Sequence, residues 1–218
     1  MQTAPALNIE VVLDFICPWS YIFLKKLDNV IEQTKNIEKR INYLPYLLEP
    51  DLPATGVDRN HFLQKKFGSK ENLRKILPPL KSESEAYGIQ FDFSKITNIP
   101  NTLDCHRVVQ WLADTPYQKQ CIEIIFQNYF SHGIDISNTN QLISLVKKLD
   151  INTLEIERWL QSPKDIERVK SIDANLKSLG IAATPFIIIN NQYTLSGEES
   201  IETISAAIKF AKSTMAES

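Results

Sequence analysis

The amino-acid sequence predicts an α/β fold in which a large helical segment interrupts the sheet. Three observations predict this class. The first 50 residues hold two short apolar runs around a helical pattern, residues 51–179 show mostly helical patterns, and the remaining residues return to short strands and a final helix. The predicted order is therefore β-α-β, a helical block, and β-β-α.

The opening segment has the pattern of a β-α-β unit. Residues 9–16 are rich in β-branched and aromatic side chains, which is typical of a buried strand. Pro18 suits the first position of a helix, because its missing N–H costs nothing there. Residues 41–48 form a second apolar run with Pro45 inside it, which favours an edge strand. We expect a parallel strand pair with a right-handed crossover.

The middle segment is predicted to be helical. Pro50, Pro53 and Gly56 mark the loop that precedes it, and the pair Pro78-Pro79 is expected to break one helix from the next. The predicted helices are Asp58 to Phe67, Ser69 to Ile76, Leu80 to Tyr87, Thr102 to Asp114, Tyr117 to Ser131, Asn138 to Leu149, Thr153 to Leu160 and Pro163 to Leu179.

The C-terminal segment returns to strands. A β-rich run begins at Thr184, and Asn190-Asn191 tolerates positive φ, so these residues can turn the run into a hairpin. Ser196 and Glu199 have the spacing of a capping box before the closing helix.

This order of elements is that of a thioredoxin-like fold with a large all-helical domain inserted between its β-α-β and β-β-α halves. We predict a discontinuous thioredoxin-like domain of residues 7–50 and 180–214, and a helical insertion domain of residues 51–179.

Composition excludes several classes of protein. The 218 residues are 43% apolar and 23% charged, enough for a sizeable core, and 24 basic against 26 acidic residues argue against a nucleic-acid partner. No apolar run approaches the ~20 residues of a membrane span, and residues 1–5 lack the start of a secretory signal. We therefore expect a cytoplasmic protein. The odd number of cysteines, 3, argues against a disulfide framework.

The segment Cys17-Pro18-Trp19-Ser20 is the candidate active site. A cysteine at the start of a helix meets the partial positive charge of the helix end, so we expect the pKa of Cys17 to fall to roughly 3.5–7.5. Ser20 lies one turn later, where its hydroxyl can stabilise the thiolate. The alternative is a buried structural cysteine.

The residues from Asp14 to Tyr21 resemble the active-site segment of DsbA-family thiol oxidoreductases, in the FrnE-like branch. Residues 49–53, 100–107 and 126–130 agree with that branch. The resemblance implies that Thr184-Pro185 forms a cis peptide against the Cys17 sulfur and offers its backbone to a peptide or thiol. Pro18 and Trp19, which flank the thiol, complete the predicted substrate-binding residues.

The motif departs from that branch at Ser20, where a second cysteine is usual. The two-cysteine cycle cannot run without it, so an external thiol has to complete turnover, and we expect glutathione to be this cosubstrate. The resemblance extends to kappa-class glutathione transferases and 2-hydroxychromene-2-carboxylate isomerases, which carry Ser at the first position of the motif. We predict no bound cofactor and no metal site.

Three further residues are accessory candidates. Asp14 is expected to be a half-buried acid near Cys17 that either relays a proton or binds the following loop. Cys105 is a candidate resolving thiol and His106 a candidate base, with ordinary packing favoured for both.

The functional prediction is a monothiol thiol-disulfide oxidoreductase acting through Cys17 on a disulfide or thiol substrate. The first alternative is a glutathione-dependent isomerase or transferase of a small aromatic substrate. The second is a non-catalytic binding or chaperone module. No motif indicates the oligomeric state, so a homodimer stays open.

Overall fold

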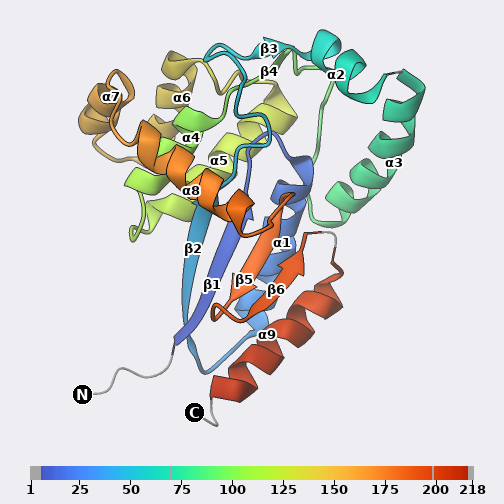
Figure 1. The fold of residues 1–218 in the computed structure, drawn as a ribbon, viewed down its shortest axis with the longest axis vertical. Coiled ribbons are helices and arrows are strands. Elements are labelled where there is room, and N and C mark those ends of the chain that lie inside the picture. The colour runs from blue at the N-terminus through green and yellow to red at the C-terminus, as the bar shows by residue number, and fades with distance from the viewer. Residues whose placement is uncertain (1–5, 69, 198, 216–218) are drawn as a thin grey trace.

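Strands from both ends of the chain form one mixed sheet (Figure 1). The structure is a computed structural model that describes residues 6–68, 70–197 and 199–215. The strand order is β2-β1-β5-β6; β1 and β2 are parallel, whereas β5 is antiparallel to both of its neighbours. The strands are β1 (Ala6–Leu13), β2 (Glu38–Pro45), β5 (Phe186–Ile189) and β6 (Tyr193–Ser196).

Helices cover both faces of this sheet. Alternate β1 residues from Leu7 to Leu13 are buried in the main core, against α1 (Pro18–Gln33) and α9 (Ile201–Met215). Val12 points to the other face, into a smaller apolar cluster with Leu176 of helix α8 (Ile166–Ser178). This alternation is the period of two that a strand between two apolar layers requires.

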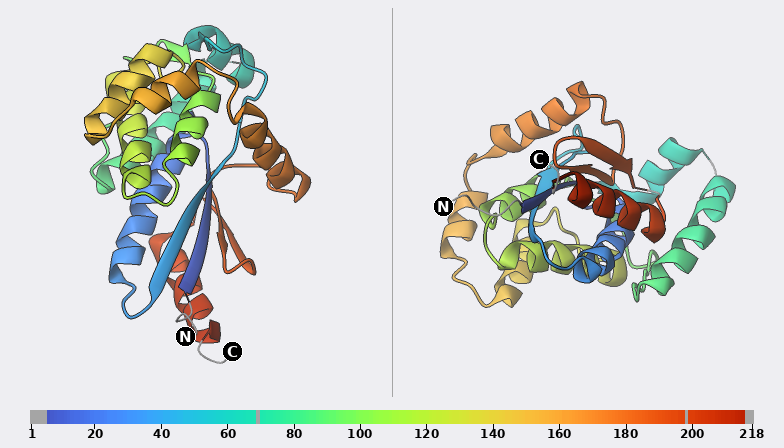
Figure 2. Two further views of the ribbon diagram at one scale, coloured as in Figure 1. Left: turned by 90° about the vertical axis from the view of Figure 1, so that its left-hand side faces the viewer. Right: turned by 90° about the horizontal axis from the view of Figure 1, so that it is seen from below.

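The segment between β2 and β5 is mostly helical and lies above the sheet in Figure 1 and in the left view of Figure 2. The predicted thioredoxin-like fold with a helical insertion is confirmed. The helices of this segment are α2 (Arg59–Phe67), α3 (Lys70–Ala86), α4 (Leu103–Trp111), α5 (Tyr117–His132), α6 (Thr139–Val146), the short 3-10 helix η1 (Lys147–Leu149), α7 (Leu154–Leu160) and α8 (Ile166–Ser178).

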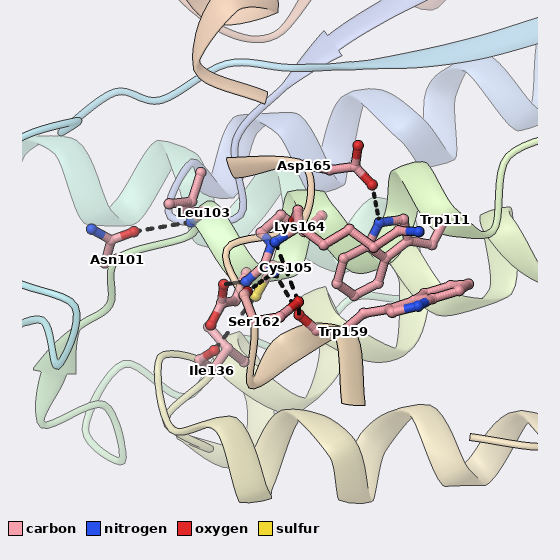
Figure 3. Close-up of polar contacts among 11 residues, drawn as sticks. Asn101, Leu103, Cys105, Trp111, Ile136, Trp159, Ser162, Lys164 and Asp165 are labelled. Carbon is pink, nitrogen blue, oxygen red and sulfur yellow. Dashed lines mark hydrogen bonds and ion pairs between the residues drawn. The ribbon is translucent and has the colours of Figure 1, made fainter. Parts of the chain in front are cut away.

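One buried arginine joins α4 to the connection between α7 and α8. The Arg107 side chain is 1% exposed and donates hydrogen bonds to the carbonyl oxygens of Trp159 (2.7 Å), Ser162 (2.6 Å) and Lys164 (2.8 Å). Figure 3 shows this region, including the bond from Trp111 Nε1 to Asp165 Oδ2 (2.7 Å). These carbonyls lie in the last turn of α7 and in the connection after it, so Arg107 holds this connection against α4.

The insertion is not wholly helical, which corrects the prediction. Val57–Asp58 (β3) pairs antiparallel with Asn98–Ile99 (β4). The Asn98 amide, which donates to Thr55 O (2.8 Å) and to Asp135 Oδ2 (3.1 Å), fixes this pair. Long-range side-chain bonds of this kind leave no local pattern in the sequence.

Two local predictions are wrong. Helix α3 continues through Pro78 and Pro79, because both prolines are exposed while Leu80 beyond them is 2% exposed and packs in the core. The cap of α9 is Ser200, whose Oγ accepts from Thr203 N (3.2 Å), rather than Ser196. Two predictions concern residues that the structure does not describe: the absence of a secretory signal at residues 1–5 and the start of a helix at Ser69.

Two other local predictions are confirmed. The hairpin turns at Asn190 (φ 51°) and Asn191 (φ 55°), and β2 is an edge strand that ends at Pro45. Within the described ranges, none of the helices is long and apolar enough to cross a membrane.

Candidate active site

The chain places Cys17 at the start of a helix that leaves the end of β1. Cys17 is the N-cap of α1 and Pro18 is its first residue, as predicted. Cys17 N donates to Asp14 O and Ser20 N donates to Cys17 O, both at 3.1 Å. The Cys17 side chain does not cap the backbone N–H groups of the first turn, so the thiol stays available at the helix end.

The residues that face Cys17 lie directly before β5, in the C-terminal part of the chain. The Thr184-Pro185 peptide is cis, the form that the resemblance implies. Cys17 Sγ donates to Thr184 O at 3.4 Å, so the thiol faces this backbone directly. Gly197 backs the turn, because a Cβ there would lie 2.0 Å from Pro185 Cγ. Residues separated by most of the chain therefore build one site.

The expected fall in the pKa of Cys17 is wrong. Cys17 is 6% exposed, and this burial raises the pKa of its thiol above the ordinary value. Ser20 and Thr184 oppose the effect and lower the pKa, while the negative charge of Asp14 raises it slightly further. The sequence shows the helix end, but the burial depends on the rest of the fold.

Cys17 still differs from the other two thiols. Burial alone raises the pKa of Cys121 to about 12, and burial with nearby acids raises that of Cys105 well above its ordinary value. Hydrogen-bonding groups that oppose burial act only on Cys17 among these three described cysteines. All three are free. Cys17 is therefore the one of these three described thiols whose thiolate has stabilising groups beside it.

Three buried polar atoms have no hydrogen-bond partner among the described residues: Ser20 Oγ, Thr184 Oγ1 and His106 Nε2. The two hydroxyls lie close enough to Cys17 to lower the pKa of its thiol, although neither makes a hydrogen bond of ordinary geometry. Buried polar groups in folded proteins nearly always have partners. Unpaired atoms concentrated at a thiol are consistent with groups that act on a substrate or on the sulfur.

Asp14 is fully buried, not half-buried as expected. Its Oδ2 accepts from Leu48 N (2.7 Å) and its Oδ1 from Ile16 N (3.4 Å), so the predicted bond to the following loop is confirmed. His106 Nε2 lies 3.7 Å from Asp14 Oδ1, and both side chains are buried. The acid and the candidate base therefore share one buried position beneath the loop that holds Cys17.

Cys105 does not take part in the contact between Asp14 and His106, because its hydrogen-bond partner lies elsewhere. Its Sγ donates to Ile136 O at 3.5 Å, as Figure 3 shows. The next residue, His106, instead packs its ring against Phe15 at a centroid distance of 5.0 Å. Neighbouring residues on a helix point in different directions, so the structure brings His106 and not Cys105 next to Asp14.

A cavity of about 170 Å³ that the sequence did not reveal adjoins the motif. Ile16 and Pro18, the two neighbours of Cys17, line it together with Arg59. Trp19 is half-buried and packs against the main core. The other residues that line the cavity are mostly apolar and come from five segments of the chain: Leu48, Phe62, Leu63, Lys66, Phe67, Leu77, Leu80, Phe93, Ile96, Ile99, Tyr129 and Phe130.

No three His, Cys, Asp or Glu side chains converge as metal ligands within residues 6–68, 70–197 and 199–215. The chemistry that this site offers is that of one buried thiol with hydroxyl and backbone groups around it.

Comparisons with known proteins agree with this arrangement. The family model of the DSBA-like thioredoxin domain matches residues 8–209. A probable DsbA oxidoreductase from Streptomyces coelicolor has a TM-score of 0.86 at 18% identity, covering 95% of this chain and 90% of its own. No curated protein sequence matches the chain.

Two further solved structures share the fold. A 2-hydroxychromene-2-carboxylate isomerase has a TM-score of 0.72 at 16% identity, covering 97% of this chain and 99% of its own. The cytosolic disulfide reductase DsbM from Pseudomonas aeruginosa, in a structure with GSH, has a TM-score of 0.64 at 12% identity, covering 95% and 98%. At these identities the likeness shows the fold alone.

Proposed function

Because the chain belongs to the DSBA-like thioredoxin domain family, we propose that it is a thiol-disulfide oxidoreductase with Cys17 as its single nucleophile and glutathione as its second substrate. The observation that supports this best is the position of Cys17 Sγ, at the start of α1 and 3.4 Å from Thr184 O of the cis peptide. Ser20, one turn along the same helix, holds a hydroxyl where a resolving thiol would stand.

The proposed reaction consists of two exchange steps on a mixed disulfide between glutathione and a substrate thiol. In the first, the Cys17 thiolate attacks the glutathione sulfur, forms an S–S bond and expels the substrate thiolate, which takes up a proton. In the second, the thiolate of a free glutathione attacks the bound glutathione sulfur and expels Cys17. One substrate thiol is released, and two glutathiones leave as their disulfide.

The surrounding groups have distinct roles in this scheme. Ser20 and Thr184 stabilise the Cys17 thiolate, since both lower the pKa of the thiol against the effect of burial. Ser20 has no sulfur, so the adduct on Cys17 persists until a second glutathione arrives. We propose the cytoplasm as the compartment, because it keeps thiols reduced and supplies glutathione.

A second candidate function is a glutathione-dependent isomerase or transferase. The observation that favours it is the apolar cavity bounded by Ile16 and Pro18, which suits a small non-peptide molecule. In this scheme Cys17 orients glutathione and undergoes no net redox change.

Mass spectrometry after incubation with oxidised glutathione tests the first proposal. We expect one glutathione adduct, mapped to Cys17 and released by added thiol. Cys17→Ser should abolish the adduct, whereas Cys121→Ser, which removes another buried thiol elsewhere in the fold, should leave it unchanged. An unmodified Cys17 under these conditions would contradict the redox proposal and favour the second candidate.

Ser20→Cys tests the role of the serine. The introduced thiol lies one turn from Cys17 on the same helix, so it can attack the adduct and expel glutathione, leaving an intramolecular disulfide. Adding Cys105→Ala excludes that cysteine as a substitute. A wild-type adduct that disappears only when Cys105 is present would place the resolving thiol on α4 instead.

A further inference from the structure

Arg59 lines the cavity beside Cys17, and none of the described carboxylates forms an ion pair with it. Arg59, the first residue of α2, is half-buried and lines the cavity, yet its guanidinium has no ion pair or side-chain hydrogen bond with any described residue. Burial lowers the pKa of Arg59, and Tyr129, which also lines the cavity, acts in the opposite direction. A guanidinium nevertheless stays protonated at neutral pH.

The second cation of the cavity is already neutralised. Lys66 pairs with Glu49, and its Nζ lies 5.3 Å from the centroid of the Phe62 ring. Partly buried charges in folded proteins are normally paired. Among the described residues that line the cavity, Arg59 is therefore the cation without a counter-ion, and an anion entering the cavity would supply one.

The other residues that line the cavity determine which chemical group attached to that anion can bind there. Around Arg59 the lining side chains are aliphatic or aromatic, such as Leu63, Phe93 and Ile99. The volume of about 170 Å³ is close to the ~150 Å³ of an apolar cavity that accepts one benzene ring. The space thus suits one compact apolar group.

We propose that this cavity binds a small amphipathic anion, with its apolar group inside the cavity and its carboxylate on the guanidinium of Arg59. A carboxylate presents two oxygens that match the two N–H groups of the arginine fork. This ligand differs from a peptide or thiol lying along Thr184-Pro185. That the anion is a substrate of Cys17 rests on the proposed function; the binding itself does not.

NMR titration of the isotopically labelled full chain with phenylacetate and with the uncharged phenylacetamide tests the proposal. We expect shifts at the cavity residues and an affinity for the acid about tenfold or more above that for the amide. In Arg59→Gln this preference should disappear, and in Arg59→Lys, which keeps the charge but loses the fork, it should be intermediate. Arg59→Lys also serves if Arg59→Gln does not fold.

Arg40→Gln is the matched control. Arg40 is exposed on β2, pairs with Glu38 and does not line the cavity, so this change alters the net charge equally but should leave the preference for the acid intact. Equal affinities for acid and amide in the wild type, an unchanged preference in Arg59→Gln, or shifts confined to residues outside the cavity would overturn the proposal.

The same titration with Cys17→Ser separates this inference from the proposed function. Binding to Cys17→Ser with the wild-type preference supports the anion site whatever the thiol does. If the wild type forms the glutathione adduct but binds no phenylacetate, the anion site is wrong and the thiol chemistry stands.

Discussion

Replacing Asp14 by asparagine is expected to lower the stability of the protein while making the Cys17 thiol more acidic. The carboxylate accepts from Leu48 N (2.7 Å) and from Ile16 N (3.4 Å), one bond to each oxygen. Asparagine has only one oxygen, so its NH₂ group must face one of these two N–H groups. A buried donor is left without an acceptor, at a cost of about 1–3 kcal/mol.

The effect on the thiol has the opposite sign. The charge of Asp14 raises the pKa of Cys17, so the neutral amide removes part of that increase. A lower pKa means a larger thiolate fraction at a given pH, and iodoacetamide should then label Cys17 faster near neutral pH. The same substitution should shift the unfolding equilibrium roughly 5- to 150-fold toward the unfolded state, since ~1.4 kcal/mol is a factor of ten.

Two assays and one control variant check this reasoning. Urea unfolding followed by tryptophan fluorescence gives the change in stability, and peptide mapping gives the labelling rate of Cys17. Asp173→Asn is the control, because Asp173 Oδ1 accepts from Leu47 N (2.9 Å) in the same loop but does not act on Cys17. It should lose stability and keep the wild-type labelling rate. Unchanged or slower labelling of Cys17 in Asp14→Asn would refute the electrostatic argument.

Three further substitutions or titrations give sharp expectations. His106→Phe keeps a ring at its position and removes a buried Nε2 that has no hydrogen-bond partner and lies 3.7 Å from Asp14 Oδ1, so thermal unfolding should show equal or higher stability; a large loss would mean that His106 is ion-paired with Asp14. Gly197→Ala should lower the free energy of unfolding, measured by urea denaturation, by about 1–3 kcal/mol, because the new Cβ collides with Pro185. It should also slow formation of the glutathione adduct on Cys17. Wild-type stability and rate would contradict this contact. Iodoacetamide labelling of Cys17 should keep rising above about pH 8.5, since burial raises its pKa, and should exceed that of Cys121 throughout; a plateau below about pH 8 would contradict the raised pKa.

The sequence predicted those features that depend on local backbone chemistry. Pro18 at the first helical position fixed the start of α1 and hence the place of Cys17. Asn190 and Asn191 fixed the hairpin, because both adopt the positive φ that its turn requires. In each case the residue type restricts its own φ or hydrogen bonding, so the conformation follows without knowledge of the rest of the fold.

Features that depend on burial were not predictable in this way. The raised pKa of Cys17 depends on the whole environment that encloses the motif, and the motif alone indicates the reverse direction. Leu80, buried in the core, keeps α3 helical beyond two prolines that should end it. The position of Arg59 at the cavity was not predictable, because the apolar residues around its guanidinium come from distant segments of the chain.

The raised pKa of Cys17 bears on the direction of the proposed exchange. A thiol whose thiolate is stabilised, as in strongly oxidising disulfide enzymes, is held in its reduced form and gives up its disulfide easily. Burial of Cys17 destabilises the thiolate instead, so a mixed disulfide on Cys17 is favoured relative to one on an acidic thiol. The same high pKa makes Cys17 a poor leaving group, which slows the second step. With Ser20 unable to attack from within the motif, both effects favour an enzyme that takes glutathione from other thiols and waits for reduced glutathione to remove it, rather than one that oxidises dithiols.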